Sequence, residues 1–162
     1  MKKMIKNLAA ILTVFLVSST AFGQNENPFV GTWDIDLLAS DFGGAQAPEN
    51  MSRTYAELGN DSFMYLVATV SPDGEIGGSS ATYRYDQNRY LIASITANNQ
   101  ATIAYRKIND RTVEYTVRIG EQITQIGAKT ISPDGRVLRI AIQFPASQGE
   151  QGNQILAFNR RR

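Results

Sequence analysis

Short segments rich in Val, Ile, Thr, Tyr and Phe recur along most of the chain, with turn residues between them, and this feature constrains the fold most strongly. No window longer than a few residues has the i, i+3, i+4 spacing of apolar residues that an amphipathic helix requires. Segments of this composition, bounded by Gly, Pro, Asn, Asp and Ser, are typical of antiparallel strands. We predict ten strands, over residues 30–38, 52–58, 62–70, 79–86, 90–97, 101–108, 111–119, 121–131, 136–144 and 153–160.

Several of these segments also show the two-residue alternation of a strand with one dry face. Within 111–119, the apolar residues Val113, Tyr115 and Val117 alternate with polar residues, and 136–144 shows the same pattern. Consecutive strands joined by short turns favour an up-and-down meander, and closing such a sheet removes its exposed edges. We therefore predict an all-β fold, an up-and-down antiparallel β-barrel of eight to ten strands. A barrel of that size has room for side chains and one small ligand.

The first 23 residues have the composition of a signal peptide. Three lysines precede a mostly apolar run over residues 8–17, and small residues follow up to Gln24. The run is shorter than the roughly 20 apolar residues that a helix needs to span a bilayer. We therefore expect cleavage before Gln24, a single barrel domain over residues 24–162, and a secreted or periplasmic protein.

The chain contains no His and no Cys, which excludes several kinds of chemistry. Ser-His-Asp and Cys-His catalysis, imidazole or thiolate metal sites, disulfides and a cysteine-linked lipid anchor all need one of these residues. After removal of the leader, thirteen basic and fifteen acidic residues would remain, a net charge of −2. This charge does not favour nucleic acid or an anionic membrane as a partner. We expect no metal and no cofactor.

Residues 29–36 read Phe-Val-Gly-Thr-Trp-Asp-Ile-Asp, and Ser40-Asp41-Phe42 follow. This stretch resembles the opening strand of calycins, the group of lipocalins and fatty-acid-binding proteins. It is most similar to small secreted bacterial lipocalin-like proteins that begin Phe-x-Gly-Thr-Trp. The resemblance implies a barrel with a ligand-binding interior. We find neither the Thr-Asp-Tyr signature of lipocalins nor the Arg-x-Tyr pair by which fatty-acid-binding proteins hold a carboxylate, so it does not imply a free fatty acid as ligand.

The same resemblance implies a structural plug at one end of the barrel. Gly31 would leave room for a close backbone approach, and the Trp33 indole would fill that end. In lipocalins an arginine after the last strand lies over this ring, where it adds a cation–π contact. Arg160 is the candidate for that arginine by its position.

Tyrosines are the candidate ligand-binding residues. If Trp33 faces the interior, strand alternation places several phenol rings on the same inward faces. Such rings would line a pocket with apolar surface, and their hydroxyls could fix a polar group of a ligand. The alternative is that they only stabilise the core and the cross-strand pairs. The candidates are Tyr65, Tyr83, Tyr85, Tyr105 and Tyr115.

These observations favour a non-enzymatic, secreted or periplasmic carrier of a small hydrophobic molecule. A first alternative is a cofactor-free isomerase or cyclase, which would need a carboxyl group buried among the tyrosines. A second is a β-domain that binds another protein through an exposed apolar patch. A small outer-membrane barrel fits less well, because the turns are short at both ends and no aromatic girdles are present.

Overall fold

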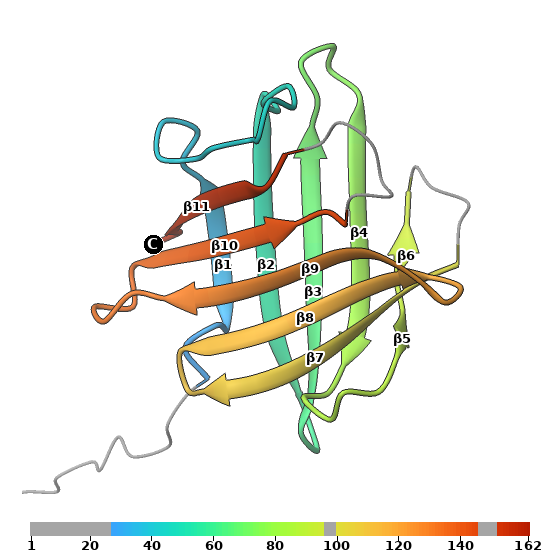
Figure 1. Cartoon of the computed structure of the whole chain (residues 1–162). Coiled ribbons are helices and arrows are strands. Elements are labelled where there is room, and N and C mark those ends of the chain that lie inside the picture. Colours follow the sequence, from blue (N-terminus) through green and yellow to red (C-terminus); the bar gives the residue numbers. More distant parts are fainter. Residues whose placement is uncertain (1–26, 96–99, 146–151) are drawn as a thin grey trace, which may run out of the picture.

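The computed structural model describes residues 27–95, 100–145 and 152–162, and the expected signal peptide lies outside them. Within the described residues, eleven strands form one antiparallel sheet, shown in Figure 1. None of the described residues forms a helix that is long and apolar enough to cross a membrane. The strands are β1 (Gly31–Ile35), β2 (Asn50–Gly59), β3 (Ser62–Val70), β4 (Ile76–Tyr83), β5 (Tyr90–Leu91), β6 (Ala93–Ser94), β7 (Ala101–Asn109), β8 (Thr112–Ile119), β9 (Gln122–Ile131), β10 (Val137–Gln143) and β11 (Gln154–Arg160).

The strand order is that of an up-and-down barrel. Strands β1 to β4 pair in sequence, β7 to β11 pair in sequence, and β11 pairs with β1 to join the two sets. In Figure 1 the second set crosses in front of the first. The predicted all-β, up-and-down barrel architecture is therefore confirmed.

The segment between the two sets nearly closes the barrel. Its first half, β5, pairs with β7, and its second half, β6, pairs with β4. The backbone changes partner at Ile92, whose N–H donates to the carbonyl of Ala101, whereas Ile95 donates to Gly78. A single strand was predicted here, over residues 90–97. Because its two halves bind opposite edges, the count is eleven strands and not eight to ten.

Two of the connections between strands have the sequence Ser-Pro-Asp-Gly, over residues 71–74 and 132–135, and both form tight turns. In the turn after β3, the Gly74 N–H donates to the Ser71 carbonyl at 2.9 Å, and Gly74 has φ +85°. The turn before β10 repeats this arrangement with Gly135 and Ser132, at 2.9 Å and φ +70°. A positive φ at the last turn position favours glycine, which is why these two Ser-Pro-Asp-Gly stretches end strands cleanly.

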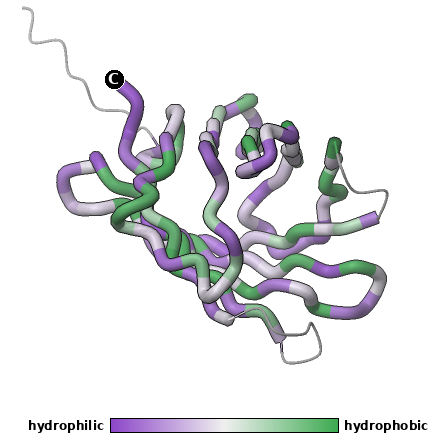
Figure 2. The backbone as a smooth tube through the Cα atoms, turned by 90° about the horizontal axis from the view of Figure 1, so that it is seen from above, coloured by the Kyte–Doolittle hydropathy of each residue, from purple (hydrophilic) through white to green (hydrophobic). Residues whose placement is uncertain are grey.

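The core fills the inside of the barrel and is built from alternate residues of the strands. Figure 2 shows hydrophobic and hydrophilic residues alternating along most of the sheet. On β10, Leu138, Ile140 and Ile142 are buried while Arg139 and Ala141 between them are exposed. Trp33, Leu138 and Phe158 are completely buried at the junction of the two strand sets. The alternation along each strand therefore also determines which polar side chains point into the barrel.

Candidate functional site

One end of the core is a clamp made by Trp33 and Arg160. The Arg160 guanidinium carbon lies 4.1 Å from the centre of the Trp33 ring, and the indole Nε1–H donates to the Phe29 carbonyl at 2.9 Å. The same guanidinium donates to the carbonyls of Pro28, Val30 and Gly135 at 2.5, 2.7 and 2.8 Å. Gly31 has φ +130°, and a Cβ there would lie 2.7 Å from Arg160 Nη1. These contacts give the clamp a structural role.

Above the clamp, the five candidate tyrosines form one connected group. Tyr65, Tyr83, Tyr105 and Tyr115 are buried, and Tyr85 is half-buried. Tyr83 and Tyr105 have ring centres 4.1 Å apart, and Tyr105 and Tyr115 have ring centres 5.8 Å apart. Burial raises the pKa of Tyr65 to about 12 and shifts Tyr83, Tyr105 and Tyr115 in the same direction. Their hydroxyls therefore stay protonated and can donate hydrogen bonds at neutral pH.

A lysine lies in the middle of these rings. Lys129 is only 2% exposed, and its Nζ donates to the Tyr105 hydroxyl at 2.5 Å. Its Nζ lies 4.5, 4.8, 5.1 and 5.5 Å from the ring centres of Tyr105, Tyr55, Tyr115 and Tyr65. Burial lowers the pKa of Lys129 well below its ordinary value, and the positive charge of Arg53 lowers it further. The four ring faces favour the ammonium form, but burial acts more strongly in the opposite direction.

Arg53 enters the same space from β2, where it is the cross-strand partner of Trp33. Its guanidinium carbon lies 5.4 Å from the Phe158 ring centre. Neither Arg53 Nε nor the Tyr55 hydroxyl, both buried, makes a hydrogen bond of regular geometry. Within residues 27–95, 100–145 and 152–162, no carboxylate forms an ion pair with Arg53 or Lys129. The site therefore has unused donor capacity and an uncompensated positive charge.

Arg53 and Lys129 border an interior cavity of about 390 Å³. This volume lies in the usual range for small-molecule sites. One end of the cavity is polar, with Tyr65, Tyr105 and Tyr115 beside the two basic residues. The rest of the wall is mixed: Val67, Ile92, Ala101, Ile103, Val117, Ile119 and Phe144 are apolar, and Ser79, Ser94, Thr124 and Gln125 are polar.

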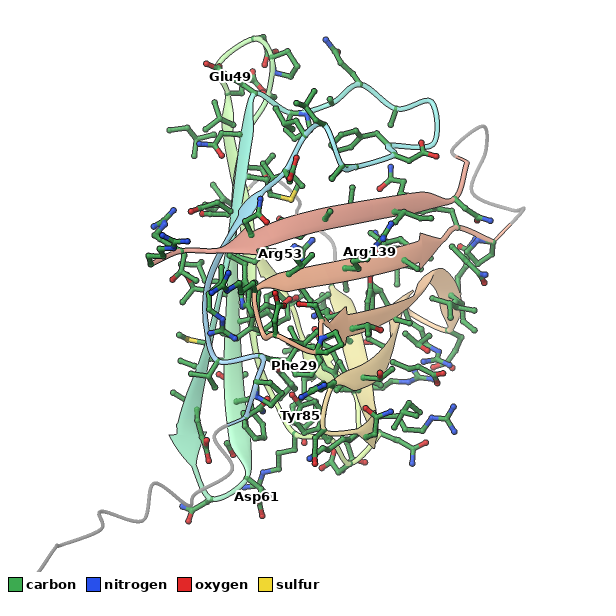
Figure 3. The ribbon with its side chains drawn as sticks, turned by 90° about the vertical axis from the view of Figure 1, so that its left-hand side faces the viewer. Phe29, Glu49, Arg53, Asp61, Tyr85 and Arg139 are labelled. Atoms are coloured by element: carbon green, nitrogen blue, oxygen red, sulfur yellow. The ribbon has the colours of Figure 1, made fainter. Side chains whose placement is uncertain are left out.

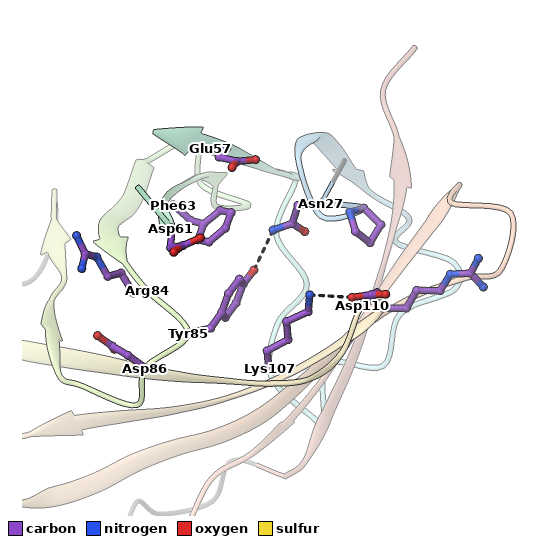
Figure 4. A pocket seen from close by; sticks show the side chains of 11 residues that line it. Asn27, Glu57, Asp61, Phe63, Arg84, Tyr85, Asp86, Lys107 and Asp110 are labelled. Atoms are coloured by element: carbon purple, nitrogen blue, oxygen red, sulfur yellow. Dashed lines mark hydrogen bonds and ion pairs between the residues drawn. The ribbon is translucent and has the colours of Figure 1, made fainter. Parts of the chain in front are cut away.

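A second, wider depression of about 920 Å³ lies at the mouth where the chain enters the barrel (Figure 4). Its side chains carry mixed charges, and Lys107 and Asp110 form an exposed ion pair of 2.8 Å. Tyr85 lines this mouth and accepts a 3.4 Å hydrogen bond from the Asn27 amide. Figure 3 shows Tyr85 near this end of the molecule and Arg53 further inside. The charges at the mouth are largely balanced, whereas those beside the interior cavity are not, so the interior cavity is the stronger candidate site.

The two pockets divide the predicted tyrosines. Tyr65, Tyr105 and Tyr115 border the interior cavity, Tyr85 borders the mouth, and the buried Tyr83 packs against both Tyr85 and Tyr105. Ligand contact by any of the five stays a prediction.

Three inward-facing residues were missed from the sequence: Arg53, Tyr55 and Lys129. Arg53 and Tyr55 form an Arg-x-Tyr pair on β2, so the statement that the chain lacks such a pair is wrong. The signal for Lys129 was its place two residues before the apolar Ile131 in a predicted strand, where both side chains share a face.

No protein-family model matches the sequence, and no curated protein matches it significantly. Solved structures do match it. A point mutant of the fluorescent protein UnaG aligns with a TM-score of 0.60 and 11% identity, over 84% of this chain and 98% of the other. Rv2717c from M. tuberculosis aligns with a TM-score of 0.55 and 15% identity, over 83% of this chain and 94% of the other.

A third match is the tryptamine complex of the amine binding protein of Rhodnius prolixus. It aligns with a TM-score of 0.51 and 10% identity, over 85% of this chain and 66% of the other. At such identities the likeness shows the fold alone. The chain has a calycin-like barrel fold.

Proposed function

We propose that this protein is a carrier that binds a small, largely apolar molecule inside its barrel and acts outside the cytosol. The observation that carries the proposal is the interior cavity of about 390 Å³, which combines seven apolar residues with a basic, donor-rich group around Arg53 and Lys129. An apolar wall contributes affinity through buried area, and a few placed donors fix the orientation of the ligand. The solved amine binding protein, whose structure holds tryptamine, supports the use of this fold for such ligands.

The polar end of the cavity indicates what the ligand carries. A buried polar group that lacks a well-formed hydrogen bond is unfavourable by up to about 1–3 kcal/mol. Arg53 Nε and the Tyr55 hydroxyl, which interact with each other without regular geometry, are two such groups. A ligand oxygen that accepts from them would remove this penalty on binding. We infer that the ligand presents a carbonyl or carboxyl oxygen to Arg53 and keeps its apolar body among Ile103, Val117 and Phe144.

The isomerase alternative has no comparable support. It needs a carboxyl group buried among the tyrosines, whereas the buried polar side chains in the described part of the chain are Thr124 and Lys129. The leader sequence supports the proposed location: the protein released by osmotic shock should begin at Gln24, which N-terminal sequencing checks.

Native mass spectrometry of the purified protein should show a retained small ligand, and the emptied protein should take up a fluorescent fatty-acid probe. Arg53→Met should weaken probe binding about 10- to 100-fold, because a hydrogen bond to a charged group contributes about 1.5–3 kcal/mol. Arg139→Met is the matched control, since Arg139 is exposed on β10 and borders neither pocket. Repeatedly empty spectra together with no probe uptake would contradict the proposal.

A further inference from the structure

The amine of Lys129 has a setting that differs from that of an ordinary lysine. It is held inside the barrel, and its one hydrogen bond recorded in the described structure is to the Tyr105 hydroxyl. It faces Arg53 and Tyr55 of β2, Tyr65 of β3, Tyr105 of β7 and Tyr115 of β8. None of these groups is a carboxylate that would hold the amine as an ammonium. A desolvated amine next to another cation is the arrangement that makes lysine a nucleophile.

Two donors accompany this amine. Tyr55 lies beside it, with the Tyr55 ring centre 4.8 Å from Lys129 Nζ, and the Tyr55 hydroxyl lies near Arg53 without a hydrogen bond of regular geometry. Burial raises the pKa of Tyr55, so this phenol remains a proton donor at neutral pH. The Nε–H of Arg53, which makes no hydrogen bond of regular geometry, is the second donor. Donors aimed at a carbonyl oxygen polarise the carbonyl and stabilise the negative charge that forms there when an amine attacks.

We propose that Lys129 captures apolar aldehydes inside the barrel by forming an imine with them. This rests on the proposed function, because the aldehyde must first enter the interior cavity. The neutral Nζ attacks the carbonyl carbon while Arg53 and Tyr55 donate to the carbonyl oxygen. Nitrogen passes one proton to that oxygen to give a carbinolamine. The C–O bond then breaks, nitrogen loses its second proton, and the oxygen leaves as water, so that no oxidant or reductant is needed.

The surroundings of Lys129 select the aldehyde class and protect the product. The wall includes Ile103, Val117 and Phe144, whose side chains offer apolar area to an alkyl or aryl chain. The tyrosine rings around Nζ limit the access of water, and this slows hydrolysis of the imine. A hydrophilic aldehyde would gain no area burial and should react poorly.

The chain supplies its own control for an experiment. In the described residues the two lysines are Lys129 and Lys107, and Lys107 is exposed in an ion pair with Asp110. The purified protein is incubated with decanal and sodium cyanoborohydride near pH 7, which reduces any imine to a stable amine. Peptide mapping, which separates Lys129 from the N-terminal amine, should show alkylation of Lys129 at least about tenfold faster than of Lys107. Lys129→Met should abolish this adduct, and Lys107→Met should leave it unchanged.

Decanol, which has the same chain but no carbonyl group, separates this inference from the proposed function. If decanol binds but Lys107 is alkylated as fast as Lys129, or the adduct persists in Lys129→Met, the imine proposal is overturned and the carrier proposal stands. If neither decanol nor decanal enters the barrel, both proposals fail. Tyr55→Phe keeps the ring but removes the donor, so it should slow adduct formation on Lys129 by a larger factor than it weakens the binding of decanol. An unchanged rate in that variant would remove Tyr55 from the proposal.

Discussion

The stability of this protein should rise with pH through the neutral and mildly alkaline range, and Lys129→Met should abolish the rise. In the unfolded chain Lys129 stays protonated up to its ordinary pKa of 10.5, whereas burial lowers its pKa well below this in the folded protein. Between these two values unfolding takes up a proton, so raising the pH opposes unfolding. The slope is at most about 1.4 kcal/mol per pH unit, reached where the folded protein has lost this proton and the unfolded chain still holds it.

Urea unfolding at a series of pH values measures this slope directly. The rise in stability should end near about pH 10. Tyrosines of the unfolded chain ionise there, whereas the buried tyrosines of the folded protein have raised pKa values and stay protonated, so a further rise in pH favours unfolding. Lys107→Met is the matched control and should keep the wild-type slope, since Lys107 is an exposed lysine. A wild-type free energy of unfolding that stays flat from pH 7 to pH 9 would show that Lys129 is charged in the folded protein, and would remove its nucleophilic role.

The fold could be predicted because its signals are local. The two Ser-Pro-Asp-Gly turns and the alternation around Val113 and Tyr115 each depend on neighbouring residues, and nine of the ten predicted strands have a counterpart at nearly the same place in the described structure. The segment 90–97 was described incompletely because its partners are distant in sequence. Whether one strand pairs with a single edge or with two depends on how the whole sheet curves, and a short run of residues does not specify that curvature.

The candidate site was harder to predict, because the charge of its basic residues indicates the protein surface whereas their positions in the strands indicate the interior. Arg53 and Lys129 have the side chains most often found in water. Alternation, however, places Arg53 on the face of Tyr55 and Lys129 on the face of Ile131. The period of a strand fixes the face of every residue once the core residues are known. The register therefore outweighs the polarity of single side chains, and a basic residue at an inward position of an otherwise apolar face indicates a site.

Close packing around Lys129 also depends on a residue whose role is visible only across strands. Gly127 is the cross-strand partner of Tyr115, and a Cβ at Gly127 would lie 2.3 Å from the Tyr115 ring. The ring therefore lies over the glycine and is directed toward the amine. Neither residue alone predicts this arrangement, since it requires the pairing register of β8 and β9.

Replacement of Trp33 should give the largest loss of stability in this protein. Trp33 is completely buried, and Trp33→Ala should lower the free energy of unfolding by about 3–5 kcal/mol, as expected for a large aromatic side chain removed from a core. Urea unfolding at constant pH measures the change. Leu66→Ala is the control, since Leu66 is 46% exposed on β3 and should lose less than about 1 kcal/mol. If Trp33→Ala lowered the free energy of unfolding as little as Leu66→Ala does, the clamp would not be needed for the fold.

The contribution of Arg160 to this clamp can be separated from that of the indole. Gly31→Ala leaves Trp33 in place but puts a Cβ 2.7 Å from Arg160 Nη1, at a backbone φ of +130° that alanine rarely adopts. Arg160 covers the indole and donates hydrogen bonds to three backbone carbonyls. If these contacts stabilise the barrel, Gly31→Ala should lower the free energy of unfolding, and adding Arg160→Met should lower it only slightly further. Gly74→Ala is the matched control, because Gly74 also has a positive φ but nothing lies within 4 Å of its Cβ position. Losses that simply add in Gly31→Ala/Arg160→Met would show that the two residues act independently, since coupled neighbours give non-additive changes.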